Sequence, residues 1–209
     1  MEQKTDNGQT EDRLNIPIIV GKNIDLCAIR SDEEAIYYYT KWMNDQEVAY
    51  CIGRTGIIVT KLDEKAWAEK KRGDNEHYFC IVEKLPDGKR RLIGTCTCVG
   101  SSGVGRFEYT LGICIGESDG RQKGYGSEAM SLMTAYAFES LGAHRVCLRV
   151  HEDNERAIRC YKRVGFMECG RDHEAIYNGE GFCDRIHMEI TRSMYDSLTD
   201  NSPCMELGM

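Results

Sequence analysis

The sequence predicts a single α/β domain in which helices flank a mixed, mostly antiparallel sheet. Its 209 residues suit one domain better than two. Hydrophobic residues make up 41% of the chain and charged residues 29%, as in an ordinary globular protein. Strand-like and helix-like segments alternate without a repeat or a linker, and turn residues join two pairs of neighbouring strand-like runs. These observations together favour one domain with strands in mixed directions.

The first half of the chain predicts, in order, a strand at 24–30, a helix from Ser31, a helix at 61–72 and hairpin strands at 77–84 and 91–99. Ser31 and Glu34 form a Ser-x-x-Glu capping box, which is typical of a helix N-terminus. The second helix should end before Gly73. Turn residues at 85–89, with Pro86 and Gly88, predict that the strands on either side of them, 77–84 and 91–99, form a hairpin.

The second half predicts, in order, a strand at 105–115, a helix at 127–141, a strand at 145–150, a helix at 155–164 and hairpin strands at 166–176 and 182–190. Gly142 stands where a helix C-cap is expected, and Gly165 ends the later helix in the same way. Asn154 can cap that helix at its start. The segment 178–181, Asn-Gly-Glu-Gly, has the composition of a hairpin turn.

The two ends of the chain are expected to be flexible, with the domain between them at 14–196. Residues 1–13 are polar and acidic and contain no apolar core after a basic start, so they do not resemble a secretory signal. Residues 197–209 are expected to form a flexible tail. No apolar run approaches the ~20 residues that span a bilayer. We therefore expect a cytoplasmic protein that does not associate with membranes.

Composition also bears on partners and metals. The net charge of −7 disfavours a nucleic-acid partner and is compatible with a cationic substrate, although it can equally serve solubility alone. The eleven cysteines are scattered through strand-like and helix-like segments without a Cys-x-x-Cys pair. Without a secretory signal, this pattern favours reduced thiols that pack as small hydrophobic groups. We expect no metal site, because clustered ligands at turn spacing are missing.

A glycine-rich loop joins the strand at 105–115 to the next helix. Glycines there let the backbone approach a ligand closely, and the first turn of a helix presents free amide hydrogens and a positive dipole end. A diphosphate is the natural ligand for such a loop. Its residues are Arg121, Gln122, Lys123, Gly124, Tyr125, Gly126 and Ser127.

Other readings of this loop stay open on its residues alone. A P-loop is disfavoured, because Lys123 precedes its glycine and no Ser or Thr follows in register. A dinucleotide fold would accept Gly124 and Gly126 with Ala129 in third place, but its acidic partner, Glu152, comes later than that motif asks. A tight turn that only caps a helix is the third reading.

A second motif, Asn154-Glu-Arg-Ala-Ile-Arg-Cys-Tyr161-Lys-Arg-Val-Gly165-Phe166, follows the next strand. Together with Arg121-x-x-Gly124-x-Gly126 it resembles the GCN5-related N-acetyltransferase (GNAT) superfamily, especially the branch that modifies ribosomal-protein N-termini and polyamines. The resemblance extends over residues 24–194 and is specific from 111 to 166. Segments 42–45 and 184–188 also look like that branch.

This resemblance implies a GNAT-like fold with splayed central strands and acetyl-CoA as co-substrate. It implies that Ile113 and Ile115 pair with the pantetheine arm through main-chain groups, as an added strand would. Residues 122–127 would bind the pyrophosphate through amides, with Arg121 and Lys123 nearby. Asn154 would hydrogen-bond the pantetheine or acetyl region, and it can serve as a helix cap as well.

The resemblance also implies catalytic roles. Tyr161 lies about two helical turns after Asn154, so both can face one cleft, and its phenol would protonate the leaving thiolate. The alternative for Tyr161 is simple packing. Related sequences often place Glu at the position of Thr110, so the base is open: Glu108 is the nearest carboxylate on the same strand face, while Glu33 and a water chain are alternatives.

Two function classes compete with an N-acetyltransferase acting on a protein N-terminus, a polyamine or a small-molecule amine. One is a sensor or scaffold that binds acetyl-CoA without turnover. The other is a nucleotide-binding oxidoreductase, which gives the Asn154–Phe166 motif no task. Edge strands make a homodimer plausible. His151 and His173, at strand ends, are expected to be structural.

Overall fold

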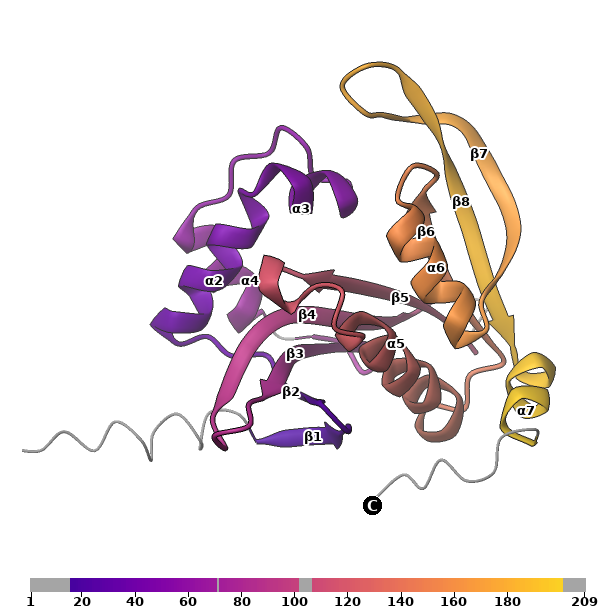
Figure 1. Ribbon diagram of the computed structural model, residues 1–209, viewed down its shortest axis with the longest axis horizontal. Helices are drawn as coiled ribbons and strands as arrows, with labels where there is room; N and C mark the ends of the chain where they lie inside the picture. The colour runs from indigo at the N-terminus through magenta and orange to yellow at the C-terminus, as the bar shows by residue number, and fades with distance from the viewer. Residues whose placement is uncertain (1–15, 71, 102–106, 201–209) are drawn as a thin grey trace, which may run out of the picture.

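An eight-stranded sheet forms the centre of the molecule (Figure 1). The computed structural model describes residues 16–70, 72–101 and 107–200. Along the sheet the strands are ordered β1-β2-β3-β4-β5-β6-β8-β7. Their bounds are β1 Pro17–Val20, β2 Ile24–Ala28, β3 Glu76–Lys84, β4 Arg90–Gly100, β5 Glu108–Ile115, β6 Arg145–His151, β7 Met167–Tyr177 and β8 Phe182–Thr191.

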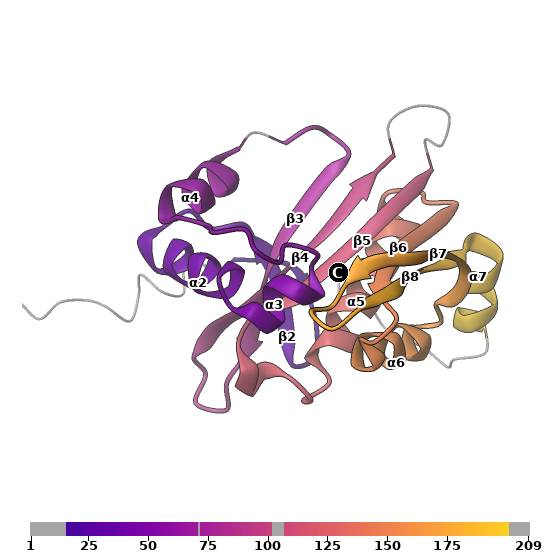
Figure 2. The ribbon, with the colours of Figure 1, turned by 90° about the horizontal axis from the view of Figure 1, so that it is seen from above.

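Helices cover both faces of this sheet. Their bounds are α2 Glu33–Met43, α3 Gln46–Cys51, α4 Lys61–Glu69, α5 Tyr125–Ala135, α6 Glu155–Val164 and α7 Arg192–Asp200. One hydrophobic cluster packs α5 and α6 against one face, through residues such as Met130, Met133 and Tyr161. A second cluster packs α2 and α4 against the other face, through Tyr39 and Trp42 among others. Figure 2 shows α2, α3 and α4 on one side of the strands.

The sheet separates between β5 and β6. All other neighbouring strands pair antiparallel, whereas β5 and β6 are parallel. Their ladder has three residue pairs, from Glu108 opposite Arg145 to Thr110 opposite Cys147. Beyond Thr110 the two strands diverge. The mixed, mostly antiparallel sheet with splayed central strands is therefore confirmed.

Helix α6 begins and ends at the residues that the sequence indicates. The side chain of Asn154 accepts a hydrogen bond from the amide of Ala157, and Gly165 closes the helix at φ 109°. Helix α5 continues through a π-helical turn, Tyr136–Ser140, and Gly142 follows it with φ 66°. Both hairpins also form, β3 with β4 and β7 with β8.

The N-terminus of α2 differs from the expected capping box. The cap is Asp32, not Ser31, so the helix begins one residue later than predicted. The Asp32 carboxylate accepts the amide hydrogen of Ala35 at 3.2 Å and is itself bound by the Arg30 guanidinium at 2.8 Å. That arginine fixes the carboxylate at the helix end, an advantage that the Ser31 hydroxyl lacks.

Other boundaries differ by a few residues. Helix α4 ends at Glu69 rather than near Arg72, and the six-residue helix α3 was not expected. Helix α7 extends to Asp200, four residues into the segment expected to be a tail. Residues 1–13 and 201–209 lie outside the described residues, as does Gly105. The leader and a homodimer through the edge strands β1 and β7 stay predictions.

Every cysteine in the described part of the chain is a free thiol. Five of them are buried in the core: Cys27, Cys80, Cys96, Cys98 and Cys114. Among the helices of the described ranges, none combines the length and apolar composition that a membrane crossing requires. In those same ranges no three His, Cys, Asp or Glu side chains are grouped as metal ligands.

Candidate active site

A cavity of about 700 Å³ opens where β5 and β6 diverge. Its walls come from the end of β5, the glycine-rich loop, the first turn of α5, the end of β6, α6 and α3. This volume is in the range that encloses cofactor-sized ligands. The separation of β5 and β6, which we call the seam of the sheet, thus creates a cleft between them.

The glycine-rich loop forms one end of the cavity with unusual backbone angles. Gln122 has φ 63° and Gly124 has φ 86°. Gly124 is the N-cap of α5 and supplies no side-chain bond to the first turn, so the amides there stay available to a ligand. Gly126 and Ser127 line the cavity directly. The N-terminal end of α5 therefore has the geometry that binds phosphate oxygens.

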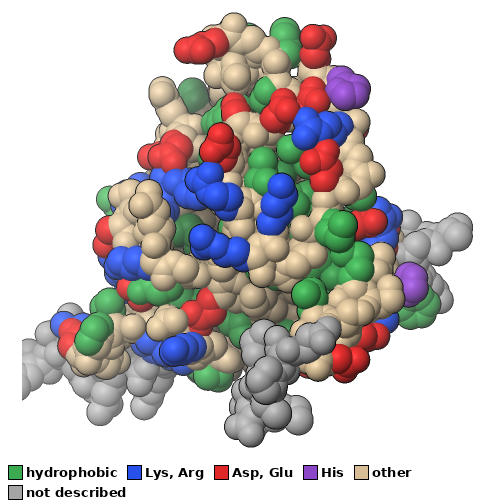
Figure 3. All heavy atoms as spheres, turned by 45° about the vertical axis from the view of Figure 1, so that its right-hand side comes forward, with side chains coloured by type: hydrophobic (Ala, Val, Ile, Leu, Met, Phe, Trp, Pro, Cys, Tyr) green, Lys and Arg blue, Asp and Glu red, His purple; other side chains and the backbone are tan. Residues whose placement is uncertain are grey.

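Arginines give the cavity a positive charge. They are Arg121, Arg149, Arg156, Arg159 and Arg163. Arg156, Arg159 and Arg163 recur every three or four residues along α6, so they share a face of that helix. Figure 3 shows basic side chains gathered on this side of the molecule. Guanidinium groups suit phosphate because they offer paired donors, so the cavity fits an anionic ligand.

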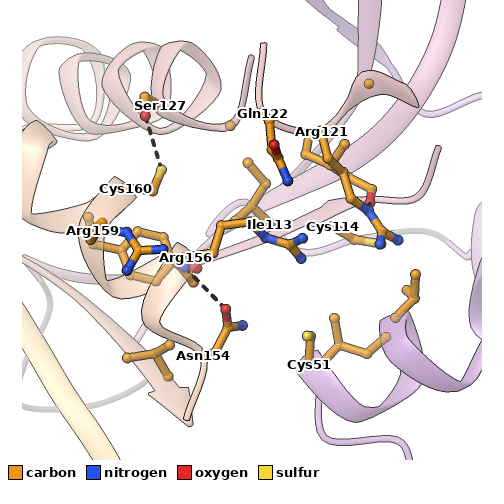
Figure 4. Close-up of a pocket in the computed structure, with 18 of the residues that line it drawn as sticks. Cys51, Ile113, Cys114, Arg121, Gln122, Ser127, Asn154, Arg156, Arg159 and Cys160 are labelled. Atoms are coloured by element: carbon orange, nitrogen blue, oxygen red, sulfur yellow. Dashed lines mark hydrogen bonds between the residues drawn. The ribbon is translucent and has the colours of Figure 1, made fainter. Parts of the chain in front are cut away.

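Asn154 lies at the opposite wall of the cavity from Arg121 (Figure 4). Its side-chain oxygen accepts the Ala157 amide hydrogen at 3.1 Å, which starts α6. Within the described residues its side-chain amide nitrogen, Nδ2, has no hydrogen-bond partner, whereas its backbone amide donates to the His151 carbonyl. Asn154 is thus a helix cap that can also donate a hydrogen bond into the cavity.

Tyr161 reaches the same cavity from α6 and is 8% exposed. Burial raises the pKa of its phenol above the ordinary value, and the neighbouring Cys160 and Cys51 thiols act in the same direction. The phenol therefore stays protonated across the neutral range. No described residue hydrogen-bonds to its hydroxyl, which leaves the proton available to a ligand.

The strand β5 offers main-chain groups to the cavity. Ile113 and Ile115 line it, and the ladder to β6 stops at Thr110. An extended ligand could pair with this stretch of β5 as an added strand does. The carbonyl of Ile115 accepts a bond from Arg121 at 3.3 Å, so the loop is tied back onto the strand.

Lys123 and Tyr125 do not line the cavity, although they belong to the loop expected to bind phosphate. Both turn toward Glu83 on β3, with the Tyr125 hydroxyl at 2.7 Å and the Lys123 ammonium at 3.5 Å. Burial opposes ionisation of Glu83, but bonds from Tyr125 and Arg91 outweigh it and lower its pKa. These two side chains thus attach the glycine-rich loop to β3 through Glu83.

Glu108 is not brought to the cavity either. It stands at the start of β5, seven residues before Ile115, or roughly 20 Å along an extended strand. Its carboxylate pairs with Arg145 at 2.7 Å. Glu108 and Thr110 do lie on the same face of β5, two residues apart. However, both belong to the stretch of β5 that is still paired with β6, before the strands diverge. Glu33, exposed on α2, does not line the cavity.

A second, smaller cavity of about 350 Å³ adjoins the first. The two share four residues: Glu47, Cys51, Asn154 and Arg156. The other residues of the second cavity are Tyr50, Asp153 and Glu155. The Tyr50 hydroxyl donates to the Asp153 carboxylate at 2.6 Å, which joins α3 to the loop after β6. Carboxylates thus dominate this cavity, as arginines dominate the first.

Sequence reasoning missed the contribution of α3 to both cavities. Glu47 binds Arg121 at 2.6 Å and Arg156 at 3.2 Å, and Cys51 lines both cavities. The available signal was Asp45, which caps α3 by accepting the Val48 amide hydrogen. An Asp followed by an acidic residue in the first turn is typical of a helix start, but six residues give no clear periodicity.

The two histidines near strand ends occupy different settings. His151 is buried at the end of β6, where burial lowers its pKa, and its ring packs edge-on against Tyr50. His173 is exposed on β7 and lies 3.0 Å from the Asp184 carboxylate. Neither lines the cavities.

Comparison with known proteins gives a consistent result. A family model described as "Acetyltransferase (GNAT) domain" matches residues 24–167. An N-acetyltransferase 9-like protein of Caenorhabditis briggsae is 30% identical over 141 residues, which cover 61% of this chain and 67% of that protein. A spermidine N(1)-acetyltransferase of Vibrio cholerae is 27% identical over 122 residues, 58% of this chain and 68% of that protein.

Solved structures share the fold. The crystal structure of spermidine N-acetyltransferase from Vibrio cholerae in complex with CoA and spermine superposes with a TM-score of 0.71. The match covers 83% of this chain and 98% of that one, at 18% sequence identity. At this identity the likeness establishes the common fold.

Proposed function

The chain belongs to the GNAT family of N-acetyltransferases, and on that premise we propose that it transfers the acetyl group of acetyl-CoA to a primary amine. One observation carries the proposal. A single cavity connects the uncapped first turn of α5 with Asn154 and Tyr161, so a phosphate site and an acid group lie in one cleft. A thioester donor that contains a diphosphate needs both.

The residues around the first cavity fit the donor. We assign its pyrophosphate to the amides of residues 122–127 and to Arg121, and its pantetheine arm to the exposed edge of Ile113 and Ile115. Support comes from the φ angles of the loop, the uncapped start of α5 and the unpaired end of β5. When bound, acetyl-CoA supplies a thioester whose carbonyl carbon is open to attack by an amine.

The chain's own groups then act at three points. A main-chain amide near Ile115 polarises the carbonyl oxygen by hydrogen bonding. Asn154 orients the acetyl region with its free amide hydrogens. Tyr161 donates its proton to the departing sulfur, since its raised pKa keeps the phenol protonated until that step.

We propose that the acceptor is a cationic amine that enters through the second cavity. Glu47, Asp153 and Glu155 line that cavity and favour a positive charge there. The relative from Vibrio cholerae named for spermidine supports polyamines as the first class to test. The proton of the acceptor ammonium leaves on this side, where Asp153 is exposed to solvent, rather than through Glu108.

Thiol release from acetyl-CoA tests the proposal. We expect release above background with at least one amine from a panel of spermidine, an aminoglycoside and a basic peptide with a free N-terminus. Calorimetry with the same preparation should show that acetyl-CoA binds. Binding without amine-dependent release by any member of the panel would instead establish a sensor or scaffold.

A charge-removing pair of variants tests the phosphate assignment. Arg121→Gln should weaken CoA binding about tenfold, because a bond to a charged group is worth ~1.5 kcal/mol or more. Lys123→Gln removes the same charge from the same loop, but Lys123 turns to Glu83, so we expect less than about a twofold change. Equal effects of the two substitutions on the CoA dissociation constant would contradict the assignment.

A further inference from the structure

Glu47 connects two arginines that reach the first cavity from different elements. Its Oε2 lies 2.6 Å from Arg121 Nη1, and its Oε1 lies 3.2 Å from Arg156 Nη2. Arg121 belongs to the glycine-rich loop and Arg156 to α6, while Glu47 comes from α3 (Figure 4 shows both arginines and Cys51 of α3). One carboxylate therefore joins three walls of the cavity.

This bridge differs from the other ion pair on the same wall. Glu155 pairs with Arg159 at 2.8 Å, but both belong to α6, four residues apart, so that pair crosses no cavity. Glu47 also lines the second cavity, which Arg121 does not. Within the described residues it is the carboxylate that lines both cavities.

We propose that Glu47 is a positioning residue that exchanges partners: it holds Arg121 and Arg156 in the free protein and yields them to the phosphates of CoA. The inference rests on the proposed function, because it takes the first cavity as the CoA site. In the free state the single negative charge of the carboxylate offsets part of the positive charge of two clustered guanidinium groups. In the bound state the phosphates take over that role.

The Glu47 carboxylate weakens CoA binding whether it stays paired with the two arginines or releases them. If Glu47 keeps its arginines, its negative charge stands beside the phosphates and repels them. If it leaves, two ion pairs are broken before the phosphates gain theirs. A neutral side chain of the same shape avoids both costs. The wild-type protein therefore binds CoA less tightly than a variant with glutamine at this position.

The exchange also couples the two cavities. Once the phosphates neutralise Arg121 and Arg156, the Glu47 carboxylate is free on the side of the second cavity, beside Tyr50 and Asp153. A cationic acceptor then meets one more unpaired negative charge. CoA and a cationic amine should consequently strengthen each other's binding, and by linkage the factor is the same in both directions.

Calorimetric titration of CoA tests the exchange without turnover. We expect Glu47→Gln to lower the CoA dissociation constant roughly fivefold at low salt, the size that two partly exposed ion pairs carry. The gain should shrink as salt rises, because exposed charges are screened. Glu168→Gln removes the same charge from an ion pair with Arg171 that lines neither cavity, so it is the matched control and should leave the constant within about twofold.

A second measurement addresses the coupling. In the wild-type protein, saturating CoA should tighten spermine binding, and Glu47→Gln should abolish that effect. If Glu47→Gln melts at a lower temperature than the wild type, Glu47→Ala repeats the test. An unchanged or larger CoA dissociation constant in the folded variants would overturn the exchange. No CoA binding by the wild type would overturn the proposed function instead.

Discussion

Tyr161→Phe is expected to lower kcat by on the order of 100-fold, the usual contribution of a positioned general acid. The substitution removes one oxygen and keeps the ring, which packs against Phe166 with centroids 6.2 Å apart. The fold and the cavity should therefore survive. Because the phenol acts on the leaving sulfur only during transfer, the CoA dissociation constant should stay within about twofold.

Tyr125→Phe is the matched control for that experiment. Tyr125 is also a partly buried phenol near the loop, but its hydroxyl is bonded to Glu83, which raises its pKa to about 12. It lies outside the cavity lining, so its loss should leave kcat within about threefold. Steady-state kinetics with a saturating amine compare the two variants. Equal kcat for Tyr161→Phe and the wild type would remove Tyr161 from the acid role.

Gly116→Ala is expected to cost about 3 kcal/mol of unfolding free energy or to prevent folding. A Cβ atom at Gly116 would stand 2.1 Å from the indole ring of Trp42, which is 1% exposed. The indole cannot retreat, because its nitrogen donates to Glu117 at 2.7 Å and the ring is part of the buried cluster that packs α2 against the sheet.

Gly120→Ala provides the comparison for this prediction. Gly120 lies in the same loop and is buried, but its nearest neighbours would be 3.6 Å from the new Cβ, an ordinary contact. We expect it to change stability by less than about 1 kcal/mol. Urea titrations of both variants measure the difference. A loss for Gly116→Ala no larger than for Gly120→Ala would show that α2 shifts to accommodate the methyl group.

Elements that carry their own end signals could be predicted from the sequence. Asn154 and Gly165 delimit α6 because the cap and the left-handed C-terminal residue are local properties. The turn at 85–89 fixes the hairpin of β3 and β4 in the same way. The position of Tyr161 could also be predicted without tertiary information, because a spacing of about two helical turns places Tyr161 and Asn154 on the same side of α6.

Features that depend on distant partners could not be predicted. The direction of Lys123 and Tyr125 is set by Glu83, about 40 residues earlier on β3. Asp32, and not Ser31, caps α2 because the Arg30 guanidinium holds the Asp32 carboxylate in place. Helix α3 is too short for a hydrophobic period, and contacts with the loop and α6 stabilise it. That Glu108 lies outside the cavity could not be predicted either, because the place where β5 and β6 part is a property of the whole sheet.

The seam between β5 and β6 also divides the sheet into two blocks of strands. Strands β1 to β5 pair each with its neighbour in sequence, and β6 to β8 form a second block in which β8 lies between β6 and β7. Within both blocks every ladder is antiparallel, so neither block depends on the other for the main-chain hydrogen bonds of its own strands. Three residue pairs then join the blocks. The width of the cleft can consequently vary between relatives without breaking the hydrogen bonds inside either block.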